Sequence, residues 1–199
     1  MELPPRTVTV VLPTYNEAQN VAAMIGRLRS ALGDAEIIVV DDDSPDLTWK
    51  VAQEAGARVI RRVGERGLAS ALKRGVEESG GEVVVWMDAD QSMPPEDVPR
   101  LLDAIDAGAD VAVGSRYATG GRDARPLLRV ITSRLINLFA NLLLPVKVSD
   151  YDSGFVAARR DVFGAAPIPS AGHGEYCIEF LCAAGLKGFE IREVGYEFT

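Results

Sequence analysis

Five short apolar runs alternate with helix-like segments through the first 115 residues of the chain. The runs lie at residues 7–12, 36–40, 57–61, 83–87 and 110–114. Between them, apolar side chains recur at helical spacing, as in Val21, Ile25, Leu28 and Leu32, a segment for which Asn16 is the expected cap. Strands this apolar, separated by helices, are typical of a parallel sheet covered on both faces. The alternation therefore predicts an α/β fold with a mostly parallel central sheet. Since no repeat or long linker interrupts it, we expect one domain over residues 1–199.

Two aspartates, Asp88 and Asp90, directly follow the fourth apolar run. Because the side chains of a strand alternate between faces, residues two apart point the same way. Two carboxylates this close repel each other unless a cation lies between them. An acid-x-acid triplet at a surface turn is often only a solvated cap, but ligands of open α/β sheets bind at the carboxyl ends of strands. The pair therefore predicts a divalent metal site beside a phosphorylated ligand, with Pro95 starting the next helix, through Ala107.

The first strand-to-helix turn, PTYNEAQN, contains no glycine. A dinucleotide-binding Rossmann turn needs glycines there so that the backbone can approach the pyrophosphate. A phosphate-binding P-loop needs a glycine-rich stretch that ends in Gly-Lys-Ser/Thr, which is also missing from the sequence. The charge of a bound diphosphate must therefore be neutralised by other means. A metal held by Asp88 and Asp90 would do this, and Arg66 and Lys73 are candidates for additional positive charge.

Charge and cysteine content narrow the class of protein. A net charge of −8 argues against a nucleic-acid-binding surface. Cys177 and Cys182 are five residues apart, a spacing that does not share a helical face, so we expect buried thiols and a reducing compartment. We expect no signal peptide in residues 1–7 and no membrane-spanning stretch. His173, the only histidine, is expected to have a surface or capping role.

Residues 124–148 form an amphipathic segment with a wide apolar face. A helical stripe contains Leu128, Ile131, Leu135, Leu138 and Leu142, and further apolar residues broaden it. Arg129, Ser133, Asn137 and Asn141 lie off the stripe. A helix that is apolar over most of its girth is either buried or faces lipid. Arg129 and Arg134 would suit an interfacial helix near anionic headgroups, so packing on the sheet and contact with a membrane surface both remain open.

Six segments together carry a resemblance to a known family. They are VVLPTYNEAQNV, IIVVDDDSPDLT, ERGLASALKRGV, VVVWMDADQSMPPED, VAVGSRYATGG and SDYDSGFVAARRDVF. Their order and spacing resemble those of inverting family-two glycosyltransferases, and especially of the polyprenol-phosphate sugar transferases such as dolichol-phosphate mannose synthases. The resemblance covers essentially residues 7–198. It implies a GT-A fold, a nucleotide-sugar-binding α/β sandwich in which an Asp-x-Asp motif holds Mg²⁺ or Mn²⁺.

The resemblance also implies the residues that hold the sugar donor. Pro13, Tyr15 and Glu17 match positions that line the nucleotide pocket, with Tyr15 near the base. Asp42 matches an acid that accepts hydrogen bonds from the base edge. Asp150 matches an acid that the family keeps near the donor sugar.

The same resemblance implies the expected metal ligands. Asp88 would bridge the metal and the ribose or diphosphate, and Asp90 would bind the metal directly. Many relatives complete the metal site with a glutamine two residues after the second aspartate. Ser92 stands at that position here, with Gln91 beside it, so Ser92 is the candidate third ligand.

Three arginines are the candidates for binding the acceptor's phosphate. Arg116 and Arg129 match family positions with this role, and Arg134 is the third candidate. A guanidinium group suits the role because its fork binds phosphate oxygens bidentately. The alternative for Arg116 is a salt bridge at the end of its strand. Asp152 stands where relatives usually carry threonine or proline, and the sequence suggests no role for it.

These residues predict metal-dependent, inverting transfer of a hexose, with mannose from GDP-mannose favoured, to a dolichyl or polyprenyl phosphate. A phosphate monoester is a dianion near neutral pH and needs no general base to attack the sugar. The alternatives are a UDP-glucose or other UDP-sugar transferase, a sugar nucleotidyltransferase and a non-catalytic nucleotide-binding protein. We expect a cytoplasmic protein at the membrane surface. The sequence leaves open the lipid length, the oligomeric state and whether the chain is truncated after Thr199.

Overall fold

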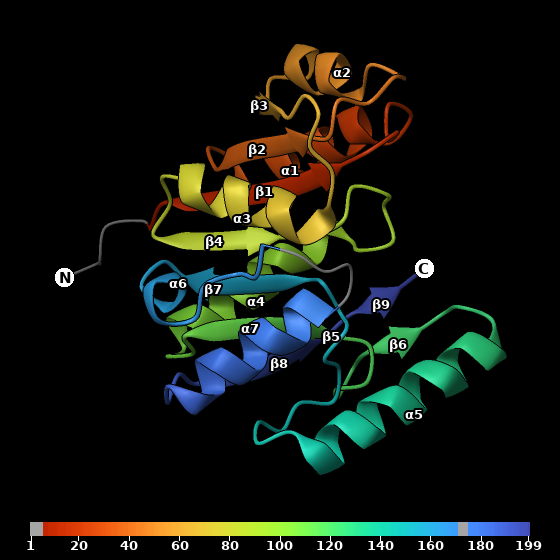
Figure 1. Cartoon of the computed structure of the whole chain (residues 1–199), viewed down its shortest axis with the longest axis vertical. Helices are drawn as coiled ribbons and strands as arrows, with labels where there is room; N and C mark the ends of the chain where they lie inside the picture. The colour runs from red at the N-terminus through yellow and green to blue at the C-terminus, as the bar shows by residue number, and fades with distance from the viewer. Residues whose placement is uncertain (1–5, 171–174) are drawn as a thin grey trace.

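A seven-stranded sheet forms the centre of the computed structural model, which describes residues 6–170 and 175–199 (Figure 1). The strand order is β3-β2-β1-β4-β7-β5-β8. Neighbouring strands are parallel except around β7, which is antiparallel to both β4 and β5. The strands are β1 (Val8–Thr14), β2 (Glu36–Asp41), β3 (Arg58–Arg61), β4 (Val83–Trp86), β5 (Val111–Ser115), β7 (Val156–Arg159) and β8 (Ile191–Gly195). The five predicted strands are β1 to β5, so the predicted α/β architecture is confirmed.

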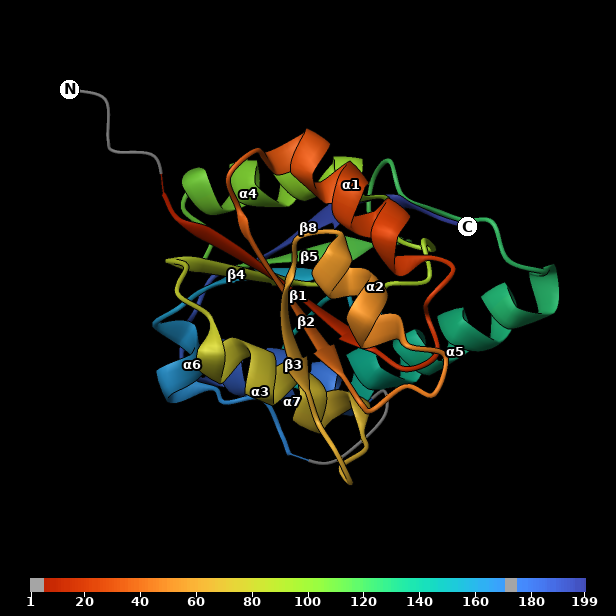
Figure 2. The same ribbon diagram turned by 90° about the horizontal axis from the view of Figure 1, so that it is seen from above.

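Helices cover both faces of this sheet (Figure 2). One layer contains α1 (Val21–Leu32), α2 (Thr48–Glu54), the 3₁₀ turn η1 (Pro95–Asp97) and α4 (Val98–Asp106). The other contains α3 (Leu68–Glu78), α6 (Val162–Ala165) and α7 (Glu175–Leu186). Side chains of β1 alternate between the two layers, since Val10 and Leu12 join one hydrophobic core and Val11 joins the other. This two-sided burial explains why the strands read as continuous apolar runs.

The first helix begins later than predicted. Asn16 does not cap it, because α1 starts at Val21 after a turn in which Asn16 adopts a φ of 62°. The turn is instead tied to the loop after β2. The amide of Asn16 donates to Ser44 Oγ at 3.0 Å, and that of Glu17 donates to Thr48 Oγ1 at 2.8 Å. The loops that follow β1 and β2 are therefore held together.

The remaining elements lie at one end of the molecule. Two short strands, β6 (Arg122–Asp123) and β9 (Glu197–Phe198), pair in parallel, and α5 (Leu127–Leu143) projects beyond them (Figure 1). Among the described residues, no helix is long and apolar enough to cross a membrane. His173 and residues 1–5, on which two of the sequence predictions fall, lie outside the described ranges.

Candidate functional site

Polar side chains gather along the edge of the sheet where β1, β2, β4 and β5 end. These four strands run in the same direction, so their carboxyl ends share one edge. The antiparallel strand β7 begins at that edge, which places the preceding segment, with Asp150 and Asp152, beside the acids that follow β4. The structure thus gathers the residues that follow four separate strands, and β7 adds the segment that precedes it.

The acid pair after β4 has an unfavourable electrostatic environment. Asp88 is half-buried, and burial raises the pKa of its carboxyl group to about 7, with Asp90, Glu17 and Asp152 adding to the effect. Asp90 is exposed to solvent. A carboxylate surrounded by three other acids is unstable in its charged form unless a cation is present. The pair therefore has the charge and the oxygen donors that a divalent cation requires.

Ser92 supports Asp90 through two hydrogen bonds. Its hydroxyl group donates to Asp90 Oδ1 at 2.6 Å, and its amide donates to the same oxygen at 3.0 Å. The adjacent residue, Gln91, has a φ of 69° and points its side chain toward Asn20, where Nε2 donates to Oδ1 at 3.2 Å. Ser92 is thus placed to orient Asp90, and its role as a metal ligand stays a prediction.

The donor set fits a magnesium or manganese ion bound together with a substrate. No group of three or more His, Cys, Asp or Glu side chains within residues 6–170 and 175–199 is arranged to hold a metal. Mg²⁺ is commonly bound by one or two carboxylates together with substrate phosphates and water, rather than by a cage of protein ligands. Two carboxylates that face an open sheet edge match that requirement.

A cavity of about 420 Å³ adjoins the predicted nucleotide-binding residues, and its lining includes Asp42 and Arg66. The Arg66 guanidinium stacks on the Tyr15 ring at 4.2 Å from its centroid, and Nη2 donates to the Tyr15 hydroxyl at 2.7 Å. Tyr15 is 40% exposed, so its ring remains available to a flat ligand. A larger cavity of about 1110 Å³ lies at the opposite end of the strands, near Arg6, and is remote from the acids.

The contacts of three other predicted donor-site residues, Asp42, Pro13 and Lys73, differ from one another. Asp42 is buried and paired with Arg62, whose Nε donates to Oδ1 at 2.7 Å, while the amide of Gly67 donates to Oδ2 at 2.8 Å. Pro13 is buried within β1, opposite Val40. Lys73 lies on α3, and its side chain has no hydrogen bond or ion pair within the described part of the chain, so no polar contact joins it to the site.

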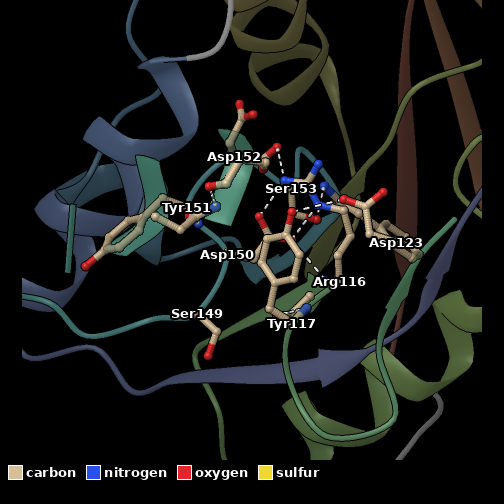
Figure 3. A network of polar contacts seen from close by, with 12 residues as sticks. Arg116, Tyr117, Asp123, Ser149, Asp150, Tyr151, Asp152 and Ser153 are labelled. Atoms are coloured by element: carbon tan, nitrogen blue, oxygen red, sulfur yellow. Dashed lines mark hydrogen bonds and ion pairs between the residues drawn. The ribbon is translucent and has the colours of Figure 1, made fainter. Parts of the chain in front are cut away.

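Arg116 and Asp150 form a buried bidentate ion pair (Figure 3). Arg116 Nε donates to Oδ2 at 2.7 Å, Nη2 donates to Oδ1 at 2.6 Å, and the Arg116 amide donates to Oδ2 at 2.9 Å. Their side chains are 2% and 0% exposed. Nη2 also donates to the Asp152 carbonyl at 3.3 Å. The strand-end salt bridge considered for Arg116 is therefore present, and its phosphate-binding role stays a prediction.

The other two candidate arginines have no carboxylate partner within residues 6–170 and 175–199. Arg129 is exposed, and its side chain makes no hydrogen bond or ion pair with the described residues. The Arg134 guanidinium lies 5.2 Å from the centroid of the Tyr117 ring, and that of Arg116 lies 5.3 Å from the same ring. Arg116 and Arg134 thus flank one aromatic side chain, although they are far apart in the sequence.

The sequence did not predict the neighbouring ion pair between Arg125 and Asp123. Arg125 Nη2 donates to Asp123 Oδ2 at 2.7 Å, and the Tyr117 hydroxyl donates to the same oxygen at 3.0 Å. These contacts, led by that from Arg125, lower the pKa of the Asp123 carboxyl to about 2. The only available signal was the charged cluster in the segment RDAR. The pair holds Tyr117 in place between Arg116 and Arg134.

Helix α5 has its polar face turned inward and its apolar face turned outward. Its one buried residue is Asn137. The entire predicted stripe is exposed, together with further apolar side chains: Leu127, Leu128, Ile131, Leu135, Ile136, Leu138, Phe139, Leu142 and Leu143. Of the two alternatives for this segment, packing of the apolar stripe on the sheet is wrong.

Comparison with known proteins assigns the family. The family described as Glycosyl transferase family 2 matches residues 9–165, which include both the acid pair and the Arg116–Asp150 pair. The chain belongs to glycosyltransferase family 2. The fold agrees, since glucosyl-3-phosphoglycerate synthase from Mycobacterium tuberculosis, crystallised with Mn²⁺, uridine diphosphate and phosphoglyceric acid, superimposes with a TM-score of 0.77 at 24% identity. That match covers 97% of this glycosyltransferase and 69% of the solved chain.

Curated relatives of this chain include enzymes whose names contain dolichol or polyprenol. It is 44% identical to the dolichol-phosphate mannosyltransferase of Pyrococcus furiosus, over 96% of its own length and 56% of the relative. It is 38% identical to the polyprenol monophosphomannose synthase of Mycolicibacterium smegmatis, over 98% and 78% of the two chains. The chain therefore spans little more than half of the Pyrococcus protein.

Proposed function

We propose that this glycosyltransferase transfers mannose from GDP-mannose to a polyprenyl or dolichyl phosphate, with inversion at the sugar, as a single GT-A catalytic domain. The observation that carries the proposal is the placement of the acid pair, the Arg116–Asp150 pair and the exposed apolar helix α5 at one end of the molecule. Relatives at 44% and 38% identity act, by their names, on dolichol and polyprenol phosphates.

Asp88 and Asp90 are the residues that would hold Mg²⁺ or Mn²⁺. When bound, the metal neutralises charge on the departing nucleoside diphosphate. Ser92 keeps Asp90 oriented through its hydroxyl group and amide. Tyr15, with Arg66 stacked on it, and the cavity beside Asp42 would receive the base and ribose. These residues position the donor so that the anomeric carbon faces the acceptor.

The acceptor's phosphate would be bound by the arginines around Tyr117. Arg116 is held rigidly by Asp150, and an arginine fixed in this way offers its remaining N–H donors at little entropic cost. Arg134 and Arg129 have no carboxylate partner among the described residues, so their charge is not neutralised within the protein. The phosphate dianion attacks the anomeric carbon directly and needs no general base.

The apolar face of α5 would lie in the headgroup layer of a membrane, which brings the lipid's phosphate to these arginines. Arg129 and Arg134 lie on the two margins of that face, where cationic side chains meet anionic headgroups. On this proposal the protein works in the cytoplasm, at the membrane surface, without crossing the bilayer through this helix.

Introducing charge into the apolar face should release the protein from lipid. We expect Leu135→Glu combined with Leu138→Glu to reduce co-sedimentation with phosphatidylglycerol vesicles at least about tenfold, because each leucine contributes about 1.5–3 kcal/mol when buried. The fold should persist, since both side chains are exposed. Leu186→Glu, at an exposed leucine on α7, is the matched control and should bind vesicles normally. Equal binding by both variants would contradict the assignment of this face.

Metal binding should depend on pH through Asp88. Because the pKa of Asp88 is raised to about 7, the metal-free carboxyl is protonated at pH 6, and the metal must displace that proton. We expect the apparent Mn²⁺ affinity to rise by about tenfold per pH unit below pH 7 and to level off above it. Titration calorimetry measures this from pH 5.5 to 8.5. Asp152→Asn, which removes one of the acids that raise the pKa, should shift the transition to lower pH.

The function itself is tested by incubating the protein with radiolabelled GDP-mannose or UDP-glucose, Mn²⁺ and a polyprenyl phosphate in vesicles. Label from GDP-mannose recovered in the lipid phase supports the proposal. Label from UDP-glucose alone would favour a UDP-sugar transferase, which is the runner-up. Nucleotide sugar formed from a sugar phosphate and a nucleoside triphosphate, with none of the label in lipid, would indicate a nucleotidyltransferase and overturn the proposal.

A further inference from the structure

Asn137 joins α5 to the segment that carries Asp150. It is the buried residue on the inward face of α5, with 3% of its surface exposed. Asn137 Oδ1 accepts a hydrogen bond from the Tyr151 amide at 2.7 Å, and Nδ2 donates to the Ser133 carbonyl at 3.0 Å. The Tyr151 amide is buried, so it needs an acceptor in the protein. A side-chain amide on α5, rather than a backbone group, supplies that acceptor.

This contact lies one residue from the buried ion pair. Tyr151 follows Asp150, whose two carboxylate oxygens receive three hydrogen bonds from Arg116 (Figure 3). A second, independent contact joins α5 to the other side of the ion pair, because Arg134 of α5 and Arg116, directly after β5, flank the Tyr117 ring. A displacement of α5 relative to the sheet would therefore move the Asp150 backbone and the surroundings of Arg116 together.

The apolar face of α5 points to solvent, and its polar face contacts the rest of the protein. At about 100° per residue, the exposed apolar side chains centre on the side of the helix opposite Asn137. A surface that contacts the apolar face therefore contacts a helix whose opposite face is hydrogen-bonded to the segment that contains Asp150 and Tyr151. A single α-helix transmits such a displacement rigidly across its own width.

We propose that Asn137 is a positioning residue that couples the seating of α5 on a lipid surface to the placement of Asp150 and Arg116. The inference rests on the proposed function, which assigns α5 to the membrane and Arg116 to the acceptor's phosphate. It adds that lipid contact promotes transfer as well as bringing the enzyme to its acceptor. A lipid surface alone, without any substrate in it, should then stimulate the reaction.

The test distinguishes stimulation of sugar transfer by lipid from binding of the protein to lipid. Transfer from GDP-mannose to a short, water-soluble prenyl phosphate is measured with and without phosphatidylglycerol vesicles that contain no acceptor. We expect the vesicles to stimulate the unmodified protein at least about fivefold, the lower end of measured couplings between two sites. Asn137→Leu, which keeps the volume but removes the acceptor for the Tyr151 amide, should lose the stimulation while still co-sedimenting with vesicles. Asn137→Asp retains the oxygen acceptor for the Tyr151 amide but loses the donor to the Ser133 carbonyl, so it should restore part of the stimulation.

Tyr151→Phe is the matched control, because it keeps the amide that Asn137 binds and removes only the hydroxyl group, which donates to the Val146 carbonyl. It should be stimulated normally. Normal stimulation of Asn137→Leu, or an unmodified protein that transfers mannose without any response to vesicles, would overturn the coupling and leave the proposed function standing. Absence of transfer to any prenyl phosphate by the unmodified protein would overturn both.

Discussion

Replacing Asp90 with asparagine is expected to lower kcat/KM for sugar transfer by about a hundredfold to a thousandfold, the usual range when one electrostatic partner of a transition state is removed. The substitution keeps the shape of the side chain but removes the charge that holds the metal. Because Asp90 is exposed and has no buried counter-ion in the part of the chain that the structure describes, the melting temperature should change little. Kinetics at saturating Mn²⁺, together with thermal unfolding, measure both effects.

The control for this substitution lies at the other end of the same strand. Glu82 is exposed just before β4, where its Oε2 accepts a hydrogen bond from the Thr7 amide at 3.2 Å. Glu82→Gln changes the net charge by the same amount but lies far from the acid pair, so transfer should be unaffected. Asp90→Asn should also lower the pKa of Asp88 below its value of about 7, because Asp90 is one of the groups that raise it. Full activity of Asp90→Asn would refute the metal site.

The strands β1, β2, β4 and β5 could be predicted because each one is a largely apolar run that is buried on both faces, whereas the predicted strand β3 lies at the edge of the sheet and is exposed or half-buried. The sequence gives no comparable signal for β7, which covers only four residues and is inserted between β4 and β5 in the opposite direction. Its place depends on long-range pairing rather than on local pattern. The strands β6 and β9, with two residues each, are too short for any period to show.

The acid pair was predictable because both carboxylates lie within four residues of the end of β4. A salt bridge was an alternative for Arg116, but the partners in the ion pairs were not predictable, because they are distant in the sequence: Arg116 and Asp150 are 34 residues apart, and Arg62 and Asp42 are 20 apart. Three residues expected to bind ligands, Asp42, Arg116 and Asp150, therefore have protein partners as well. Spacing along the chain carries no information about such contacts.

The amphipathic pattern of α5 was predictable, but its orientation was not. Periodicity identifies two faces, and the usual assumption places the apolar face inward. Here the hydrogen bonds of Asn137 to the Tyr151 amide and of Asn141 to the Val148 carbonyl, at 2.7 and 2.5 Å, hold the polar face against the protein. A polar face that contains asparagines at positions 137 and 141, in place of charged residues, was the available signal.

Breaking the buried ion pair should have the largest effect on stability. Asp150→Asn keeps the shape of the side chain but leaves the Arg116 guanidinium, 2% exposed, without a counter-charge. Removing one partner of a buried pair typically costs about 3–5 kcal/mol. At about 2–4 °C per kcal/mol for a chain of this size, the melting temperature should fall by about 10 °C. Transfer should be lost as well, because Arg116 is no longer held in one orientation.

A double substitution separates the two roles of the pair. In Asp150→Leu combined with Arg116→Met, the buried charges are absent together, and replacement of a buried ion pair by apolar residues is often neutral or stabilising. We expect the melting temperature to recover to within a few degrees of the original, while transfer to polyprenyl phosphate stays undetectable and GDP binding is retained. Recovery of transfer together with stability would show that the pair serves the fold alone. Loss of GDP binding would instead place Arg116 on the donor side of the site, because a residue that binds only the acceptor's phosphate should not affect the nucleotide.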